Sequence, residues 1–110
     1  MPTPDEFFAI DMRVGTVVHA EEFAEARKPS IKLLIDFGPE VGQKRSSAQL
    51  TTHYTPAQLV GRQVVAAVNI GTRRIAGFTS EVLVLGAMPT PTEVVLLAVA
   101  QPVTNGTRIG

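Results

Sequence analysis

The residues of this chain with the clearest capacity for chemistry lie in and near residues 69–86. Two adjacent arginines, Arg73 and Arg74, can form paired hydrogen bonds with phosphate oxygens, and arginine also stacks on the planes of bases. Short hydrogen-bonding side chains occur in the same stretch and in an earlier polar segment, which carries two more cations. The candidate RNA-binding residues are Lys44, Arg45, Ser47, Asn69, Arg73, Arg74 and Ser80.

Large apolar side chains near the same stretch indicate a different ligand. An apolar groove with a cationic rim suits an extended peptide at least as well as RNA. One tyrosine and no tryptophan leave few platforms on which bases stack. The candidate peptide-binding residues are Phe37, Tyr54, Ile70, Ile75 and Phe78. A third interpretation is that the stretch is a solvated connection whose charges serve solubility.

Residue combinations typical of catalysis are missing from the sequence. The serines lack the nucleophile-elbow context of a hydrolase. Glu21, Glu22 and Asp36 fall on a predicted loop and a predicted strand, where solvated charge is the ordinary role of an acid. Gly71 and Gly77 do not lie between a strand and a helix, as a phosphate-binding loop requires. We therefore predict a binding protein that is not an enzyme, with no catalytic residue and no organic cofactor.

Metal binding is not expected either. The two histidines, His19 and His53, have no second histidine or carboxylate at a recognised ligand spacing. His53 stands beside Tyr54, and a packing pair at a helix edge explains it better than a general base. The chain has no cysteine, no secretory signal at its start and no apolar run of the roughly 18 residues that span a membrane. The expected location is cytoplasmic, without membrane insertion.

The charges are unevenly distributed along the chain. The 110 residues have a net charge of zero, yet acids predominate in residues 1–25, whereas residues 41–80 contain five cations and no acid. If the fold gathers the middle segment on one face, a basic patch exists despite the zero sum.

The pattern of apolar and polar residues predicts a succession of short strands. These strands are expected at residues 12–20, 31–37, 43–50, 63–68, 81–87, 93–100 and 107–109. Short helices are predicted after Thr3 and Thr55, because each threonine precedes a proline as an N-cap does. We expect a bulge or bend at Gly15, and a loop marked by Pro89 and Pro91.

Strands in this order, with a helix after the third, indicate an oligonucleotide-binding (OB) barrel. We predict an all-β fold in which residues 1–110 form one domain built on a five-stranded OB barrel with short helices. Residues 1–10 are expected to form an N-terminal helix, 11–87 the barrel core and 88–110 the C-terminal strands. Phe7, Phe8 and Ile10 are too large and apolar for one exposed turn, so they either plug the barrel or contact a second subunit.

Several of these residues resemble a known family. Asn69, Gly77 and residues 73–75 and 80–86 are similar to the tRNA-binding domain shared by bacterial methionyl- and phenylalanyl-tRNA synthetases. A closer resemblance, to the CsaA family of small bacterial secretion-related chaperones, covers nearly the whole chain. It rests on residues 11–16, 25–29, 32–38, 46–49 and 73–78. Gly71 and Thr72 stand where the family has prolines, which predicts a more flexible loop.

The resemblance implies the OB fold and a homodimer made by the terminal segments, with Phe7, Phe8 and Ile10 as interface residues. It also implies a chaperone that binds unfolded polypeptides or exported preproteins and has tRNA-binding capacity. The wider family implies an alternative, a dedicated tRNA-binding protein without a chaperone role.

Overall fold

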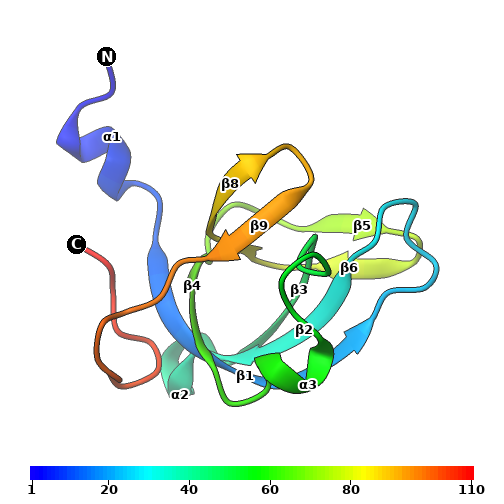
Figure 1. The fold of residues 1–110 in the computed structure, drawn as a ribbon. Helices are drawn as coiled ribbons and strands as arrows, with labels where there is room; N and C mark the ends of the chain where they lie inside the picture. Colours follow the sequence, from blue (N-terminus) through cyan, green and yellow to red (C-terminus); the bar gives the residue numbers. More distant parts are fainter.

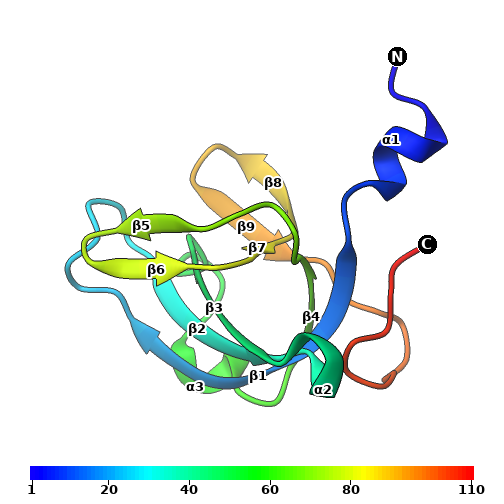
Figure 2. The same cartoon turned by 180° about the vertical axis from the view of Figure 1, so that it is seen from behind.

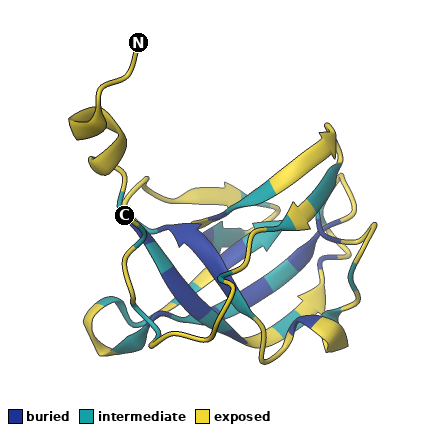
Figure 3. Ribbon diagram, turned by 60° about the vertical axis from the view of Figure 1, so that its left-hand side comes forward, coloured by how far each residue is buried: buried dark blue, intermediate teal, exposed yellow.

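Alternation along one strand defines the interior of the protein. In the computed structural model, which describes residues 1–110, strand β2 (Ile31–Asp36) buries Ile31, Leu33 and Ile35 and leaves the residues between them partly exposed. Successive side chains of a strand point to opposite faces, so this pattern places one face of β2 in the core. Figure 3 shows the same mixture of buried and less buried positions in the other barrel strands, whereas the N-terminal helix is exposed along its length.

The chain forms nine strands and three short helices. The helices are α1 (Pro4–Phe8), α2 (Gly38–Val41) and α3 (Pro56–Leu59). The other strands are β1 (Met12–Glu22), β3 (Gln43–Ala48), β4 (Gln63–Ala67), β5 (Arg73–Ile75), β6 (Phe78–Ser80), β7 (Leu83–Val84), β8 (Gly86–Thr90) and β9 (Glu93–Leu96). Capping boxes begin α1 at Thr3 and α3 at Thr55, which confirms both predicted helix starts.

Five antiparallel strands in the order β3-β2-β1-β4-β7 curl into a nearly closed barrel (Figure 1). The two ends of this sheet meet where β3 contacts the residues just before β7. There the Glu81 N–H donates to the Arg45 carbonyl at 2.8 Å, and the buried Ser46 hydroxyl donates to the Val82 carbonyl at 3.0 Å. We call this contact the closing seam. The all-β class and the OB-type barrel are therefore confirmed.

Strand β1 bends so that it can belong to both sides of the barrel. Met12–Thr16 pairs with β4, and Thr16–Glu22 pairs with β2. The register irregularity lies between Val17 and His19, so of the predicted bulge or bend at Gly15 the bulge is not found there. Gly15 has a different role: a Cβ there would lie 2.7 Å from side-chain atoms of Ile35 and Phe37. The absence of a side chain at Gly15 lets the side chains of Ile35 and Phe37 pack directly against the backbone of β1.

Residues 69–80 are not only a loop, as the sequence suggested. Strands β5 and β6 form a hairpin around Ala76 and Gly77, which both have positive φ, at 46° and 82°. Such a two-residue turn matches the right-handed twist of the paired strands. Figures 1 and 2 show this hairpin reaching toward the loop that follows β1, on one side of the barrel.

The C-terminal part also departs from prediction. The expected strand at 81–87 is divided between β7 and the start of β8. Pro89 lies within β8, whereas Pro91 lies in the turn between β8 and β9, where a loop was expected. The register shifts between Ala87 and Thr90, a place in a hairpin where a proline without an N–H is tolerated. The expected strand at 107–109 is only an isolated bridge between Arg13 and Arg108.

A second apolar cluster explains the course of the C-terminus. Met12, Val14, Val65 and Ala67 on β1 and β4 form a small cluster, against which Val99 and Ile109 pack, among others. The Val14 N–H donates to the Thr107 carbonyl, while the Gly106 and Ile109 N–H groups donate to the carbonyls of Val14 and Met12. These three bonds hold residues 106–109 against β1. The last segment therefore covers an outer face of the barrel.

The close approach at Gly15 gives a stability prediction. Gly15→Ala should lower the free energy of unfolding by about 1–3 kcal/mol, because the added methyl group overpacks the core against Ile35 and Phe37. Urea unfolding measures the change. Gly110→Ala, where no atom lies within 4 Å of an added Cβ, is the matched control and should match the wild type. Equal stability of the two variants would contradict the packing assigned to Gly15.

Candidate functional site

An open groove of about 800 Å³ lies beside the barrel. Its lining comes from the loop after β1, the end of β3, the β5–β6 hairpin and residues 83–94 of the β7–β8–β9 region. Nine of the eighteen lining residues are hydrophobic. Because it draws on four separate segments, the groove exists only in the folded chain.

All charged residues that line the groove come from the loop and the hairpin. They are Glu25, Arg27, Lys28 and Arg73. All four are exposed, and none of them forms an ion pair within the chain. We call residues 25–28 together with Arg73 the cationic side of the groove.

The remaining side of the groove carries no charge. Residues 83–94 contribute Leu83 and Met88, with 52% and 60% of their surfaces exposed, and the half-buried Leu85 and Val94. We call this set the apolar side. Exposed leucine and methionine in a concave surface are typical of a site for an apolar ligand.

The structure brings three of the sequence-predicted residues into the groove. Arg73 and Ile75 lie on one face of β5, and Ser47 lies at the end of β3. The Ser47 N–H donates to the Ser80 hydroxyl at 3.2 Å, which links β3 to the hairpin base. Ser80 itself is 9% exposed, so its hydroxyl serves this link instead of a ligand.

Arg74 points away from its neighbour. Its guanidinium donates to the Thr79 hydroxyl at 3.2 Å and to the Gly77 carbonyl at 3.1 Å, both within its own hairpin. Adjacent residues of a strand face opposite sides, so only Arg73 lines the groove. Neither arginine of this pair binds the nearby Glu81, because Arg45 occupies that carboxylate.

Arg45 belongs to the closing seam and not to the groove. Its side-chain Nε lies 3.2 Å from Glu81 Oε1, and its backbone N–H donates to the same oxygen at 3.0 Å. Burial alone would raise the pKa of Glu81. The hydrogen bonds from Arg45 and the charges of Arg45 and Lys44 outweigh burial and hold this pKa below its ordinary value. Lys44 does not line the groove either.

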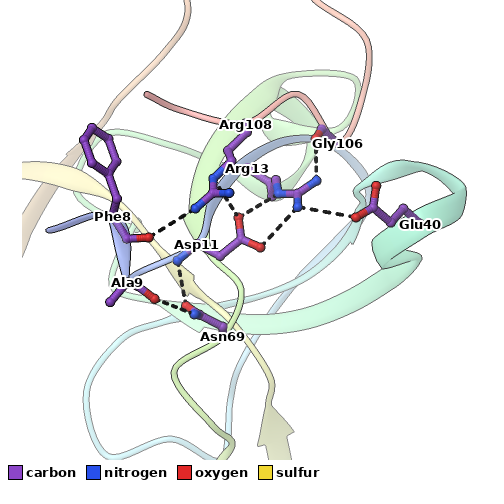
Figure 4. A network of polar contacts seen from close by, with 8 residues as sticks. All are labelled: Phe8, Ala9, Asp11, Arg13, Glu40, Asn69, Gly106 and Arg108. Carbon is purple, nitrogen blue, oxygen red and sulfur yellow. Dashed lines mark hydrogen bonds and ion pairs between the residues drawn. The ribbon is translucent and has the colours of Figure 1, made fainter. Parts of the chain in front are cut away.

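The Asn69 side chain forms hydrogen bonds at the junction between α1 and the barrel (Figure 4). Its side chain accepts from the Asp11 N–H and donates to the Ala9 carbonyl, both at 2.8 Å. The Asp11 carboxylate in turn binds Arg13 at 2.7 Å, and Arg108 donates to the Phe8 carbonyl at 3.1 Å. The hydrogen bond from Arg13 holds the pKa of Asp11 below its ordinary value despite partial burial.

Most of the predicted peptide-binding residues lie elsewhere. Phe37 is fully buried in the core, so its assignment to a binding surface is wrong. The Tyr54 hydroxyl accepts from the Leu96 N–H at 3.1 Å, and its ring packs on the core. Ile70 is 48% exposed but does not line the groove. These three positions were chosen for residue type, which does not reveal the direction of a side chain.

Phe78 does not line the groove but joins two of the segments that do. Its ring makes an edge contact with buried Phe23 at 5.5 Å between centroids, and the Lys32 ammonium lies 4.6 Å and 5.2 Å from the two ring centres. This cluster joins the loop after β1 to the β5–β6 hairpin. It therefore fixes the distance between the two segments that carry the groove's charges.

The groove is also lined by residues that were not predicted from the sequence to bind a ligand. Arg27, Lys28 and Gln49 are polar lining residues, and Leu83 and Met88 are the most exposed apolar ones. Residues 25–29 and 46–49 were part of the family resemblance, so that signal was present for the polar three. Leu83 falls within residues 80–86 of the wider resemblance, where it was part of a predicted strand, and Met88 carried no signal. The exposure of both follows from the short β7 and the separate β8–β9 hairpin.

No group of three histidine, aspartate or glutamate side chains is placed to hold a metal ion. None of the helices is long and apolar enough to cross a membrane.

Comparison with known proteins identifies the family of this chain. The model of the family described as "Putative tRNA binding domain" matches residues 12–108. The chain belongs to this family of tRNA-binding domains. The methionine–tRNA ligase of Thermotoga maritima is 32% identical over 97% of the chain, and the chain spans only 16% of that enzyme.

Within the family, the chain is CsaA-like. The crystal structure of chaperone CsaA from Bacillus anthracis is 54% identical, covers 100% of this chain and 99% of its own, and superposes with a TM-score of 0.95. The CsaA chaperone from Picrophilus torridus is 43% identical, covers 100% of both chains and has a TM-score of 0.91. The resemblance drawn from the sequence is therefore confirmed.

The closing seam predicts a defined acid sensitivity. The pKa of Glu81 lies below its ordinary value of 4.5 in the folded protein, so its stabilising contribution is complete above that value and is lost as the pH falls through the folded-state pKa. Glu81→Gln should be less stable than the wild type at neutral pH and lose less stability between about pH 5 and pH 3. Urea unfolding across this range measures it. Glu22→Gln, at an exposed acid without an ion pair, should keep the wild-type slope.

Proposed function

We propose that this protein is a non-enzymatic, CsaA-like chaperone that holds unfolded or exported polypeptides in its groove. The observation that carries the proposal is the apolar side of the groove, with Leu83 and Met88 more than half exposed. An extended segment of polypeptide covers such a surface and needs no aromatic platform. The similarity to two chaperones over their full lengths supports the proposal.

The absence of aromatic rings from the groove favours polypeptide over single-stranded RNA. None of the five phenylalanines and neither ring of the His53–Tyr54 pair lines it. Single-stranded nucleic acid is usually held by base stacking on aromatic side chains in addition to phosphate contacts. Apolar aliphatic side chains offer no equivalent surface for bases.

Binding of tRNA is the second candidate function. The cationic side favours it, because Arg27, Lys28 and Arg73 have no partners within the chain and can bind phosphates. Membership of the tRNA-binding domain family supports the same function. A cytoplasmic location goes with both candidates, since nascent polypeptides and tRNA are both found there.

Salt and one substitution test the polypeptide proposal. A chemically unfolded, labelled polypeptide should bind the wild type at both low and high salt, and Met88→Asp should reduce its affinity about tenfold by placing a charge on the apolar side. Fluorescence anisotropy measures the binding. Val60→Asp, at a residue 50% exposed outside the groove, is the matched control and should bind as the wild type does.

The same titration with tRNA separates the two candidates. Binding through phosphates weakens steeply with rising salt, whereas apolar capture does not. Failure to bind unfolded polypeptide at any salt, together with salt-sensitive tRNA binding, would overturn the chaperone proposal in favour of the second candidate.

We also propose that the protein is a homodimer associated through α1. Phe7, Phe8 and Ile10 are 48%, 44% and 43% exposed, and no residue of α1 is buried, so these side chains do not plug the barrel. Figures 1 and 2 show α1 projecting away from the barrel. A projecting apolar helix held rigidly at its base can contact the same helix of a second copy about a two-fold axis.

The dimer proposal predicts the effect of one substitution. Phe8→Glu should shift the protein toward monomer at tens of micromolar, because it buries an unpaired charge in the interface. Light scattering gives the mass of each variant. Val18→Glu, at a residue 40% exposed on β1, is the control and should leave the mass unchanged. A monomeric wild type would contradict the proposal.

A further inference from the structure

The two sides of the groove differ in chemistry, and this difference bears on which polypeptides it accepts. The cationic side contains three cations and one acid, Glu25, whereas the apolar side has no charged residue. The two sides come from segments that are far apart in the sequence, residues 25–28 and residues 83–94. Formation of the barrel does not require the charged residues to lie on one side and the apolar residues on the other.

The segments that carry the three cations are joined by the cluster of Phe23, Phe78 and Lys32. Arg27 and Lys28 lie on the loop that carries Phe23, and Arg73 lies on the hairpin that carries Phe78. The edge contact of these two rings, with Lys32 over both, joins loop and hairpin. The contact therefore keeps the two backbone segments that carry the three cations close to each other.

These cations also differ from the others nearby in having no partner. Arg45 lies 5.9 Å from the Phe78 ring, but its charge is balanced by Glu81. Arg74 is bound within its hairpin. Arg27, Lys28 and Arg73 meet only one acid, Glu25, among the groove residues, and that acid forms no ion pair with them. The side chains that line the groove therefore carry more positive than negative charge.

We infer that the groove selects polypeptide segments in which an apolar stretch adjoins acidic residues, and that it disfavours apolar stretches flanked by lysine or arginine. The inference rests on the proposed polypeptide-binding function and narrows its substrate class. The apolar stretch covers Leu83 and Met88, while the flanking carboxylates meet the three cations. Basic flanks place like charges together, which is the repulsive element that specificity needs.

A series of labelled peptides tests the inference. All share one apolar core and are flanked on both sides by three glutamates, three glutamines or three lysines. At low salt, the acidic peptide should bind the wild type about tenfold more tightly than the basic one, with the neutral peptide between them. The order should collapse at high salt, because the charges are exposed and screened.

Variants locate the effect within the groove. Arg73→Gln should reduce the ratio between the affinities of the acidic and basic peptides by about twofold to threefold. The affinity of the neutral peptide should stay unchanged. Combining Arg73→Gln with Arg27→Gln and Lys28→Gln should abolish the order. Arg74→Gln removes the neighbouring charge on the opposite face of β5 and is the matched control, with the wild-type order expected.

The outcomes separate this inference from the function on which it rests. Equal binding of all three peptides, or tightest binding of the basic one, would overturn the inference while leaving polypeptide binding intact. Failure of every peptide to bind would overturn the proposed function itself. An RNA oligonucleotide that displaces the acidic peptide and binds more tightly than any peptide would assign the cationic side to nucleic acid, and would also overturn the inference.

Discussion

The structure depends on the closure of its barrel at the seam between β3 and residues 80–82. A curved sheet with two free edges would leave unpaired backbone groups on both, and this chain is too short to cover them with helices. The seam uses few contacts: one backbone bond from Glu81, the buried Ser46 hydroxyl and the Arg45–Glu81 pair. These polar contacts explain why β3 is so polar although it belongs to the barrel.

Closure at this place also determines where the groove lies. The β5–β6 hairpin arises directly before the seam, so its base is fixed to β3 through Ser80 and Ser47. Its tip is fixed to the loop after β1 through Phe78 and Phe23. With both ends of the hairpin held, Arg73 and Ile75 lie on a rigid surface, as a site that must present side chains in one direction requires.

The sequence was sufficient to predict the barrel but not the site. The barrel could be predicted because alternation in 31–37 and the apolar run in 63–68 depend only on which faces are buried. The hairpin at 73–80 was missed because an Ala76–Gly77 turn lacks the usual asparagine or aspartate before its glycine. Residue type alone did not reveal where a side chain lies: Phe37 is in the core, and Arg74 donates within its own hairpin.

The β8–β9 hairpin has a separate consequence for how the groove adapts to its contents. It belongs to no larger sheet, and it is attached to the rest of the chain by the Leu97–Leu85 backbone bond, the Tyr54 hydroxyl, the His53–Glu93 pair and the packing of Val94 and Leu96. So few attachments place this hairpin among the segments that open locally at low free-energy cost while the barrel stays folded. In the proposed complex with a polypeptide, this side of the groove would therefore yield to a bulky side chain before the barrel does.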